Sequence, residues 1–325
     1  MARVLITGAA GFIGMHTSIR FLKEGWDVIG LDNFNEYYDV KLKRDRVENV
    51  KTFARCKTFS KFKLLKADLN SSVWDELEKI KFDAVVHLAA QAGVRYSLEN
   101  PDAYLKSNVL GFQRVLEFIK NCEIQRFVYA SSSSVYGQSS KQPFHEDEDC
   151  NDPESYYAAT KKMNELMAKS YYNTYNLSSI GLRFFTVYGP WGRPDMAPML
   201  FTKAAFSNEQ IKVFNYGNQR RDFTYIDDIV EGVLQLILMT KFPFKAEICN
   251  IGNGSPIGLM DFIGQIENVT SLKLKKDFVM AQKGEVSETY ADTSKLFELT
   301  GYKPKICLND GIKNFIAWYK NYYKI

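Results

Sequence analysis

The chain has 325 residues, 46% of them hydrophobic, which is enough for about two domains with a sizeable core. Its 42 basic and 38 acidic residues are interspersed and give a net charge of +4, so the basic stripe that nucleic-acid binding needs is missing and no nucleic-acid partner is expected. The five cysteines are scattered and form no Cys-x-x-Cys pair, which argues against a disulfide framework and favours the reducing cytoplasm. The three histidines are also scattered, so no metal site is expected. No apolar run approaches 18 residues, so no membrane span is expected.

The chain opens with a strand, a glycine-rich turn and a helix. A strand is predicted at Val4–Ile6 and a helix at 16–24, and no signal-peptide pattern precedes them, so we expect no secretory leader. The turn between them has a glycine at every third position: Gly8, Gly11 and Gly14. This spacing brings backbone N–H groups and a helix N-terminus against a pyrophosphate. The turn, with the intervening Phe12 and Ile13, therefore predicts a dinucleotide site.

A second predicted strand, Val28–Leu31, ends in an acid. Asp32 follows Gly14 by 18 residues, close to the offset of roughly 20 expected for a carboxylate on the adenosine ribose. A carboxylate at this position repels a 2′-phosphate, so the pattern favours NAD over NADP. Asn33, directly after it, is a further candidate cofactor contact.

Two later strands extend the same sheet. Phe62–Leu65 leads to Asp68 and Leu69, and Asp83–Ala90 ends in two small residues, Ala89 and Ala90. Strands alternating with helical segments predict a doubly wound parallel sheet of the Rossmann type, in which ligands gather at the carboxyl ends of the strands. Asp68 is then placed either to meet the adenine or to cap a helix. The alanines let a cofactor pass closely. His87, inside its strand, is interpreted as a core residue.

The chemistry is expected where the strand at 126–131 runs into Ser131–Ser134. A helix is predicted from Pro153 to about 175, with Asp152 as its N-cap. Tyr157 and Lys161 lie one helical turn apart on one face, where the ammonium can hold the phenol partly ionised. Strand-end hydroxyl, phenol and lysine together form an acid–base site that can take a proton from an alcohol as hydride leaves for a nicotinamide.

Three long stretches make the pattern specific: Gly181–Asp195, Arg220–Asp228 and Asp32–Asp39. With the glycine turn and the Tyr/Lys pair, they resemble the extended short-chain dehydrogenase/reductase family over nearly the whole chain. Within that family they look most like the UDP-glucuronate 4-epimerase subgroup. The resemblance implies an NAD-dependent isomerase that interconverts UDP-glucuronate and UDP-galacturonate through a 4-keto sugar.

The resemblance also implies roles for individual residues. Tyr157 would be the catalytic base, Lys161 its activator and a ribose ligand, and Ser132 the catalytic hydroxyl. Thr186, with Ser133 and Ser134, would contact the sugar carboxylate, close to Arg193. Arg221 would pair with the diphosphate of the nucleotide, because its fork matches phosphate geometry. The remaining implied contacts are Asn108 for the cofactor and Val213, Gln282 and Glu285 for the sugar nucleotide.

Departures from related enzymes narrow the reaction. Dehydratases resembling this family have an Asp-Glu pair where this chain has Ser133 and Ser134, and decarboxylases have Glu at the second position. Both activities are therefore disfavoured. Gln282 replaces a second diphosphate-binding Arg of hexose epimerases, and Glu285 replaces a usual Asp, so anchoring by that loop is less certain.

We expect an NAD-binding domain at 1–185, to which residues near 222–250 return, and a smaller α/β substrate domain at 186–325. The predicted amphipathic helices Pro101–Lys120 and Pro153–Tyr175 suggest a homodimer of the kind related enzymes form. The alternatives are a 4-epimerase of UDP-N-acetylglucosamine or its uronate, a UDP-glucuronate decarboxylase, and, from another class, a non-catalytic NAD-sensing protein.

Overall fold

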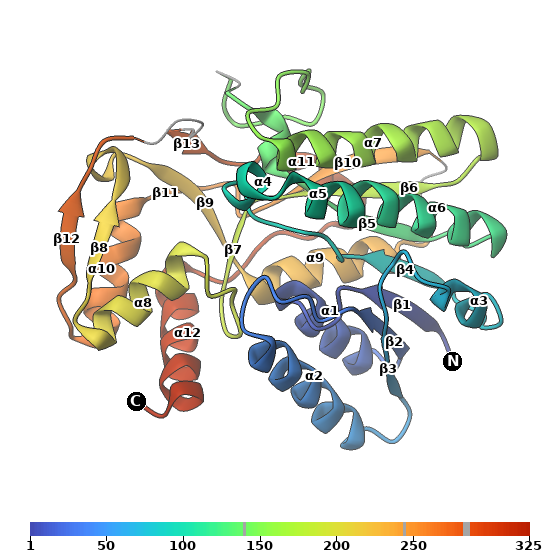
Figure 1. Ribbon diagram of the computed structural model, residues 1–325, viewed down its shortest axis with the longest axis horizontal. Coiled ribbons are helices and arrows are strands. Elements are labelled where there is room, and N and C mark those ends of the chain that lie inside the picture. Colours follow the sequence, from blue (N-terminus) through green and yellow to red (C-terminus); the bar gives the residue numbers. More distant parts are fainter. Residues whose placement is uncertain (139–140, 243–244, 282–286) are drawn as a thin grey trace.

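The computed structural model describes residues 1–138, 141–242, 245–281 and 287–325. Its main element is a seven-stranded sheet with the strand order β10-β6-β5-β4-β1-β2-β3 (Figure 1). The strands are β1 (Arg3–Thr7), β2 (Asp27–Asp32), β3 (Phe62–Lys66), β4 (Ala84–His87), β5 (Phe127–Ser132), β6 (Ser179–Phe184) and β10 (Ala246–Ile251). Every neighbouring pair is parallel. The chain therefore forms the predicted doubly wound sheet, with its topological switch between β1 and β4.

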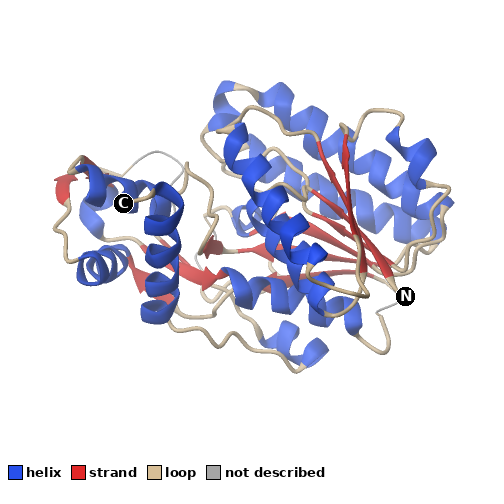
Figure 2. Cartoon of the chain, turned by 90° about the horizontal axis from the view of Figure 1, so that it is seen from below, coloured by secondary structure: helices blue, strands red, loops and turns tan. Residues whose placement is uncertain are grey.

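Helices cover both faces of this sheet, which lies edge-on between them in Figure 2. Alternate residues of β1 show the two layers, because Val4 and Ile6 pack into one apolar cluster and Leu5 into the other. The first cluster lies under α1 (Phe12–Lys23) and α9 (Ile226–Leu238). The second lies under α3 (Val73–Leu77), α6 (Gly111–Asn121) and α7 (Tyr156–Tyr175). Strands buried on both faces explain the nearly continuous apolar runs of the sequence.

A smaller lobe stands beyond the carboxyl edge of the sheet, at the left of Figure 1. It contains a four-stranded sheet of β7 (Thr186–Tyr188), β9 (Arg220–Tyr225), β11 (Pro256–Gly258) and β13 (Glu288–Thr289), and a pair of strands, β8 (Gln210–Val213) and β12 (Lys275–Phe278). Its helices are α8 (Ala197–Ser207), α10 (Leu259–Thr270) and α12 (Leu308–Tyr323), with a short turn η3 (Phe214–Gly217) after β8. Two further helices are α2 (Val40–Arg55), beside α1, and α11 (Ser294–Thr300), beside α9. The carboxyl edge of the large sheet thus faces a second wall.

Three predicted helices are wrong in their bounds. The helix predicted at 16–24 begins four residues earlier, because α1 spans Phe12–Lys23. Helix α7 begins at Tyr156, because Ser155 is its N-cap and its hydroxyl accepts the backbone N–H of Ala158 at 3.1 Å. Asp152 and Pro153 precede the helix. The stretch Pro101–Lys120 is divided into α5 (Pro101–Tyr104), a π-helical turn η1 (Leu105–Leu110) and α6, and a short α4 (Tyr96–Glu99) comes before it. Among the described residues, no helix combines the length and the apolar composition of a membrane span.

Candidate active site

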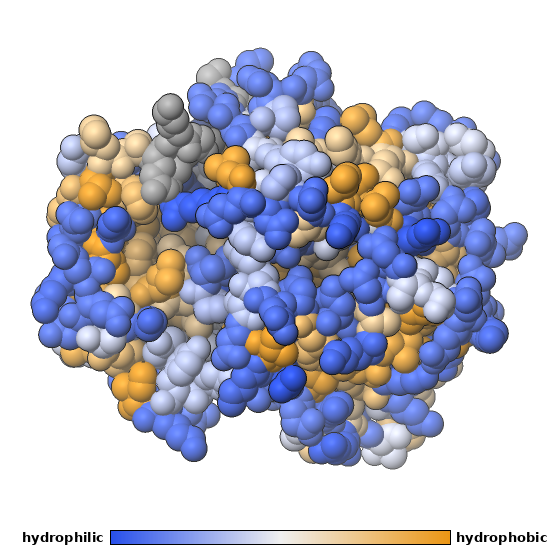
Figure 3. All heavy atoms as spheres, viewed as in Figure 1, coloured by the Kyte–Doolittle hydropathy of each residue, from blue (hydrophilic) through white to orange (hydrophobic). Residues whose placement is uncertain are grey.

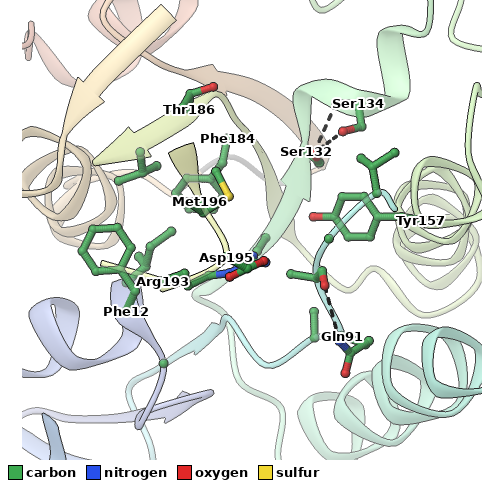
Figure 4. A pocket seen from close by; sticks show the side chains of 18 of the residues that line it. Phe12, Gln91, Ser132, Ser134, Tyr157, Phe184, Thr186, Arg193, Asp195 and Met196 are labelled. Atoms are coloured by element: carbon green, nitrogen blue, oxygen red, sulfur yellow. Dashed lines mark hydrogen bonds and ion pairs between the residues drawn. The ribbon is translucent and has the colours of Figure 1, made fainter. Parts of the chain in front are cut away.

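A cavity of about 1050 Å³ lies between the carboxyl edge of the large sheet and the smaller lobe (Figure 4). Most residues singled out from the sequence line it, although they come from distant parts of the chain. These are Gly8, Gly11, Phe12, Ile13, Gly14, Asp32, Asn33, Asp68, Leu69, Ala89, Ala90, Ser132, Ser133, Ser134, Tyr157, Lys161, Thr186, Arg193 and Arg221. The fold brings them together because the carboxyl ends of parallel strands meet at one edge.

The glycine turn forms a cradle made of backbone alone. The N–H of Gly11 donates to the carbonyl of Gly8 at 2.9 Å, and Gly11 caps α1 without a side chain over its first turn. A Cβ on Gly14 would lie 2.0 Å from that carbonyl oxygen, and a Cβ on Gly8 would lie 2.7 Å from the N of Ala89. Only glycine fits these positions. The free helix N-terminus beside them suits a pyrophosphate, so these residues fit a dinucleotide.

Two acids stand at the far end of the cradle. Asp32 accepts the backbone N–H groups of Ala10 at 3.0 Å and Phe34 at 2.8 Å. Burial raises the pKa of Asp32, against the opposing effect of these bonds and of Lys43. Asp68 accepts the side chain of Asn33 at 2.8 Å, and such bonds hold its pKa below its usual value despite burial. The next helix, α3, has Ser72 as its N-cap, so Asp68 does not cap it.

Tyr157 and Lys161 project from α7 toward the end of β5, and the phenol points into the cavity in Figure 4. The Lys161 ammonium donates to the carbonyl of Ala130 at 2.7 Å. Burial lowers the pKa of Lys161 to about 8, opposed by the charge of Glu165. Burial raises the pKa of Tyr157, opposed by hydrogen bonding with Ser132 and by the charge of Arg193. The expected lowering of the phenol pKa by Lys161 is not found, because burial of the phenol has the largest effect and raises that pKa.

Neutral hydroxyl groups line the other side of the phenol. Ser132 donates to the hydroxyl of Ser134 at 3.1 Å and accepts the Ser134 backbone N–H at 3.2 Å. Ser133 and Ser134 belong to a short turn, η2 (Ser133–Tyr136), that carries them from β5 into the cavity. Thr186 at the start of β7 completes the set from the opposite wall (Figure 4). These donors can bind an anionic group without adding a base beside it.

The two arginines predicted for the site, Arg193 and Arg221, already have partners. Arg193 forms a forked ion pair with Asp195, at 3.1 and 2.5 Å, and Asp195 also accepts the hydroxyl of Tyr37 at 3.1 Å. The guanidinium of Arg221 donates to the backbone carbonyl of Arg220 at 2.9 Å. Arg193 therefore lines the cavity as half of a neutral ion pair. To bind the sugar directly, as predicted, its guanidinium would have to hydrogen-bond the sugar and Asp195 together.

Among the residues that the structure describes, two predicted ones do not line the cavity. Asn108 lies in η1 behind the wall, where its amide group holds the backbone N–H and carbonyl of Gln91 at 2.8 and 3.0 Å. Both ends of the Asn108 side chain are used, so it supports the loop at Gln91 and does not reach a cofactor. Val213 is fully buried in the core of the smaller lobe. Gln282 and Glu285 lie outside the described residues.

Other residues that line the cavity were not predicted from the sequence. Among them are Gln91 and Gly93 from the loop after β4, and Tyr37 from the loop after β2. Gln91 directly follows Ala89–Ala90, and Tyr37 lies within the stretch Asp32–Asp39 that carried the family resemblance. The sequence signal for these residues was their position after a strand, because a loop that follows a parallel strand lies at the ligand-binding edge of the sheet whatever its residues.

Known proteins share this architecture. The model of the NAD dependent epimerase/dehydratase family matches residues 4–252. Protein CapI of Staphylococcus aureus is 46% identical over 99% of both chains. UDP-glucuronate 4-epimerase 4 of Arabidopsis thaliana is 44% identical over 98% of this chain and 76% of that protein. A crystal structure of UDP-glucuronic acid 4-epimerase from Bacillus cereus, in complex with UDP-glucuronic acid and NAD, is similar with a TM-score of 0.90 and 33% identity, covering 99% of this chain and 100% of that chain.

Proposed function

The chain belongs to the NAD-dependent epimerase/dehydratase family, and on that premise we propose that it is an NAD-dependent 4-epimerase that interconverts UDP-glucuronate and UDP-galacturonate. One observation carries the choice of reaction and substrate. The phenol of Tyr157 lines the cavity opposite neutral hydroxyls, those of Ser132 to Ser134 and Thr186, instead of the acids that elimination or decarboxylation would use.

The cofactor is held by the cradle and the two acids described above. Gly8, Gly11 and Gly14 would take the pyrophosphate at the N-terminus of α1, and Asp32 the adenosine ribose. Lys161, beside the carbonyl of Ala130, would take the second ribose. Bound there, NAD would supply a nicotinamide ring that can accept a hydride from C4 of the sugar and give it back, so the reaction would have no net redox change.

Proton transfer is the work of the protein. As its phenolate, Tyr157 would take the proton of the C4 hydroxyl and become a neutral phenol, while the Ser132 hydroxyl would hydrogen-bond the same sugar oxygen. Hydrogen bonding with Ser132 and the charge of Arg193 favour the phenolate, and burial favours the phenol. Because these influences oppose one another, the same side chain can accept the proton in the first half and donate it in the second.

The rest of the site protects and turns the sugar. Ser133, Ser134 and Thr186 would donate hydrogen bonds to the carboxylate, and none of them can act as a strong acid or base at neutral pH. Arg221 on β9 would hold the diphosphate while the keto sugar turns to present its other face. We assign this substrate half mainly to residues 186–325 and the cofactor half to 1–185.

A homodimer in the cytoplasm is also part of the proposal. Apolar side chains project from η1 and α7 on the surface: Leu105, Leu110, Met163 and Leu166. Figure 3 shows hydrophobic side chains among hydrophilic ones over the α5–α7 part of this face. Pairing of these helices with those of a second copy would bury them. The five free thiols suit a reducing compartment.

Incubation with UDP-glucuronate, followed by NMR of the product, tests the proposal. We expect UDP-galacturonate from the wild-type protein and no turnover from Tyr157→Phe, which should still hold NAD. Release of carbon dioxide would favour a decarboxylase. Conversion of UDP-N-acetylglucosamine alone would favour that epimerase, and NAD binding without any turnover would indicate a sensing protein.

A further inference from the structure

Helix α7 meets strand β5 through three side chains on one face. Tyr157, Lys161 and Glu165 follow one another at four-residue spacing, so they lie one above another along the helix. Lys161 donates to the carbonyl of Ala130 at 2.7 Å, and Glu165 accepts the hydroxyl of Ser131 at 2.6 Å. Strand residues 130 and 131 are thus tied to two successive helical turns, and Ser132 follows them beside Tyr157.

Glu165 is the member of this row without a role in the proposed reaction. Its carboxylate is buried and accepts two N–H groups of Arg183 on β6, each at 2.9 Å. Arg183 is buried as well, with its guanidinium 4.6 Å from the ring centre of Tyr136 and a bond to the carbonyl of Glu146. The carboxylate is therefore fixed from the strand side, and it fixes Ser131 in turn.

A buried ion pair contributes little net stability, because desolvation of both charges offsets their attraction. The ion pair between Glu165 and Arg183 is distinguished by its position beside the end of β5. Ser131 lies between two residues that face the helix. The carbonyl of Ala130 binds the Lys161 ammonium, and the hydroxyl of Ser132 faces the phenol of the same helix. A shift of Ser131 would therefore move both partners of the Tyr157/Lys161 pair together.

Glu165 also supplies the negative charge that acts on Lys161. Burial lowers the pKa of Lys161 to about 8, and the carboxylate of Glu165 opposes this. The other described groups around the ammonium offer no second acid. His87 on β4 stays neutral, because burial and Lys161 itself lower its pKa to about 3. Tyr157 on the same helix and the buried Tyr129 on β5 are phenols, and Asn108 on η1 is neutral. Arg183 is a cation, and it is paired with Glu165.

We propose that Glu165, clamped by Arg183, is a positioning residue of the active site that holds the end of β5 in register with α7. The proposal rests on the function proposed above only for the role of Lys161 as a ribose ligand. It predicts that the charge of Glu165 sets the pH range over which cofactor and substrate are handled.

Two variants separate this role from simple core stability. Glu165→Gln keeps an oxygen for Ser131 and removes the charge, but it leaves the buried Arg183 guanidinium without a carboxylate and should lower Tm. Glu165→Gln with Arg183→Met removes both charges and should restore most of that loss. Glu267→Gln is the matched control, because Glu267 is a buried carboxylate of α10 that binds Lys276, far along the chain from the site.

The dissociation constant of NAD and the kcat for UDP-glucuronate are measured from pH 6 to 10 for each folded protein. We expect the alkaline limb of both profiles to move to lower pH by about one unit or more in the Glu165 variants, since an opposite charge nearby shifts a pKa by about that much. The Glu267 control should keep the wild-type limb. The dissociation constant of NAD is measured without a sugar nucleotide, so this part of the test remains valid if UDP-glucuronate proves to be the wrong substrate.

Folded Glu165 variants with the wild-type alkaline limb for NAD binding would overturn the proposal. Loss of folding in both the single and the double variant would do the same, because it would assign the pair to stability alone. A wild-type protein that binds NAD with the expected pH limb but does not turn over UDP-glucuronate would contradict the proposed function and leave the role of Glu165 supported.

Discussion

Gly14→Ala gives the sharpest test of how the cofactor cradle is built. Gly14 lies in the first turn of α1, and a Cβ placed there would lie 2.0 Å from the carbonyl oxygen of Gly8. Ordinary contact begins at 3.4 Å, so the helix and the turn must separate by 1.4 Å (3.4 − 2.0). The turn cannot retreat freely, because Gly8 has a φ of +73° and its own Cβ position lies 2.7 Å from the backbone of Ala89.

The expected cost follows from this overlap. Overpacking of a close contact costs about 1–3 kcal/mol, and the upper end applies because the clashing atom belongs to backbone. Replacing a helical glycine by alanine returns about 1 kcal/mol. The net loss of about 2 kcal/mol corresponds to a fall in Tm of roughly 3 °C for a chain of this size. Losing one or two charge-assisted bonds to the pyrophosphate should weaken NAD binding by about 10- to 100-fold.

Gly264→Ala in α10 is the matched control. It is the same substitution in a helix, but nothing lies within 4 Å of the added Cβ. It should raise stability by about 0.5–1 kcal/mol and leave NAD binding unchanged. Differential scanning calorimetry and titration calorimetry with NAD measure both quantities. If Gly14→Ala binds NAD like the wild type, the close approach of α1 to the turn is not what forms the dinucleotide site.

Three further predictions concern the reaction and the assembly. Ser132→Ala should lower kcat by roughly 100-fold with little change in the affinity for NAD, since it removes one donor from the developing charge at the sugar oxygen, and stopped-flow assays with a KM near the wild-type value would bear this out. In the wild type, kcat/KM should fall as pH rises through about 8, because the depressed pKa of Lys161 means that its ammonium is lost there, and a flat profile to pH 10 would exclude the need for that charge. Leu166→Glu on α7 should convert a dimer to a monomer in light scattering, whereas Leu238→Glu, at an exposed position of α9, should not, and equal behaviour of the two variants would move the interface elsewhere.

The sequence predicted the ligand edge well, because glycines, small residues and strand-end acids carry strong local signals. Gly8, Asp32 and Tyr157 lie at the same cavity for a reason of topology that short strands and a glycine turn already imply. Element type was predicted better than element ends. Residues 151–155 hold several capping types, and only the tertiary fit shows that Ser155 and not Asp152 begins α7.

The interactions within the site were harder to predict. The break at η1 adds a residue to one helical turn, which a hydrophobic pattern does not report, and it turns Asn108 away from the cavity. Arg193 is paired with Asp195, two residues later, and Lys161 with a strand carbonyl, although both had been assigned to ligands or to the phenol. Sequence spacing shows which residues can meet, but burial and competition between partners decide which do.

The central claim is a reversible oxidation at C4 of a UDP-sugar acid, with Tyr157 moving the proton and the hydride kept within the site. NMR of the product formed from UDP-glucuronate in deuterium oxide tests it most directly. We expect UDP-galacturonate with hydrogen, not deuterium, at C4, because the hydride returns to the carbon it left without exchanging with solvent. Deuterium at C4, or the same inversion by Tyr157→Phe, would contradict it.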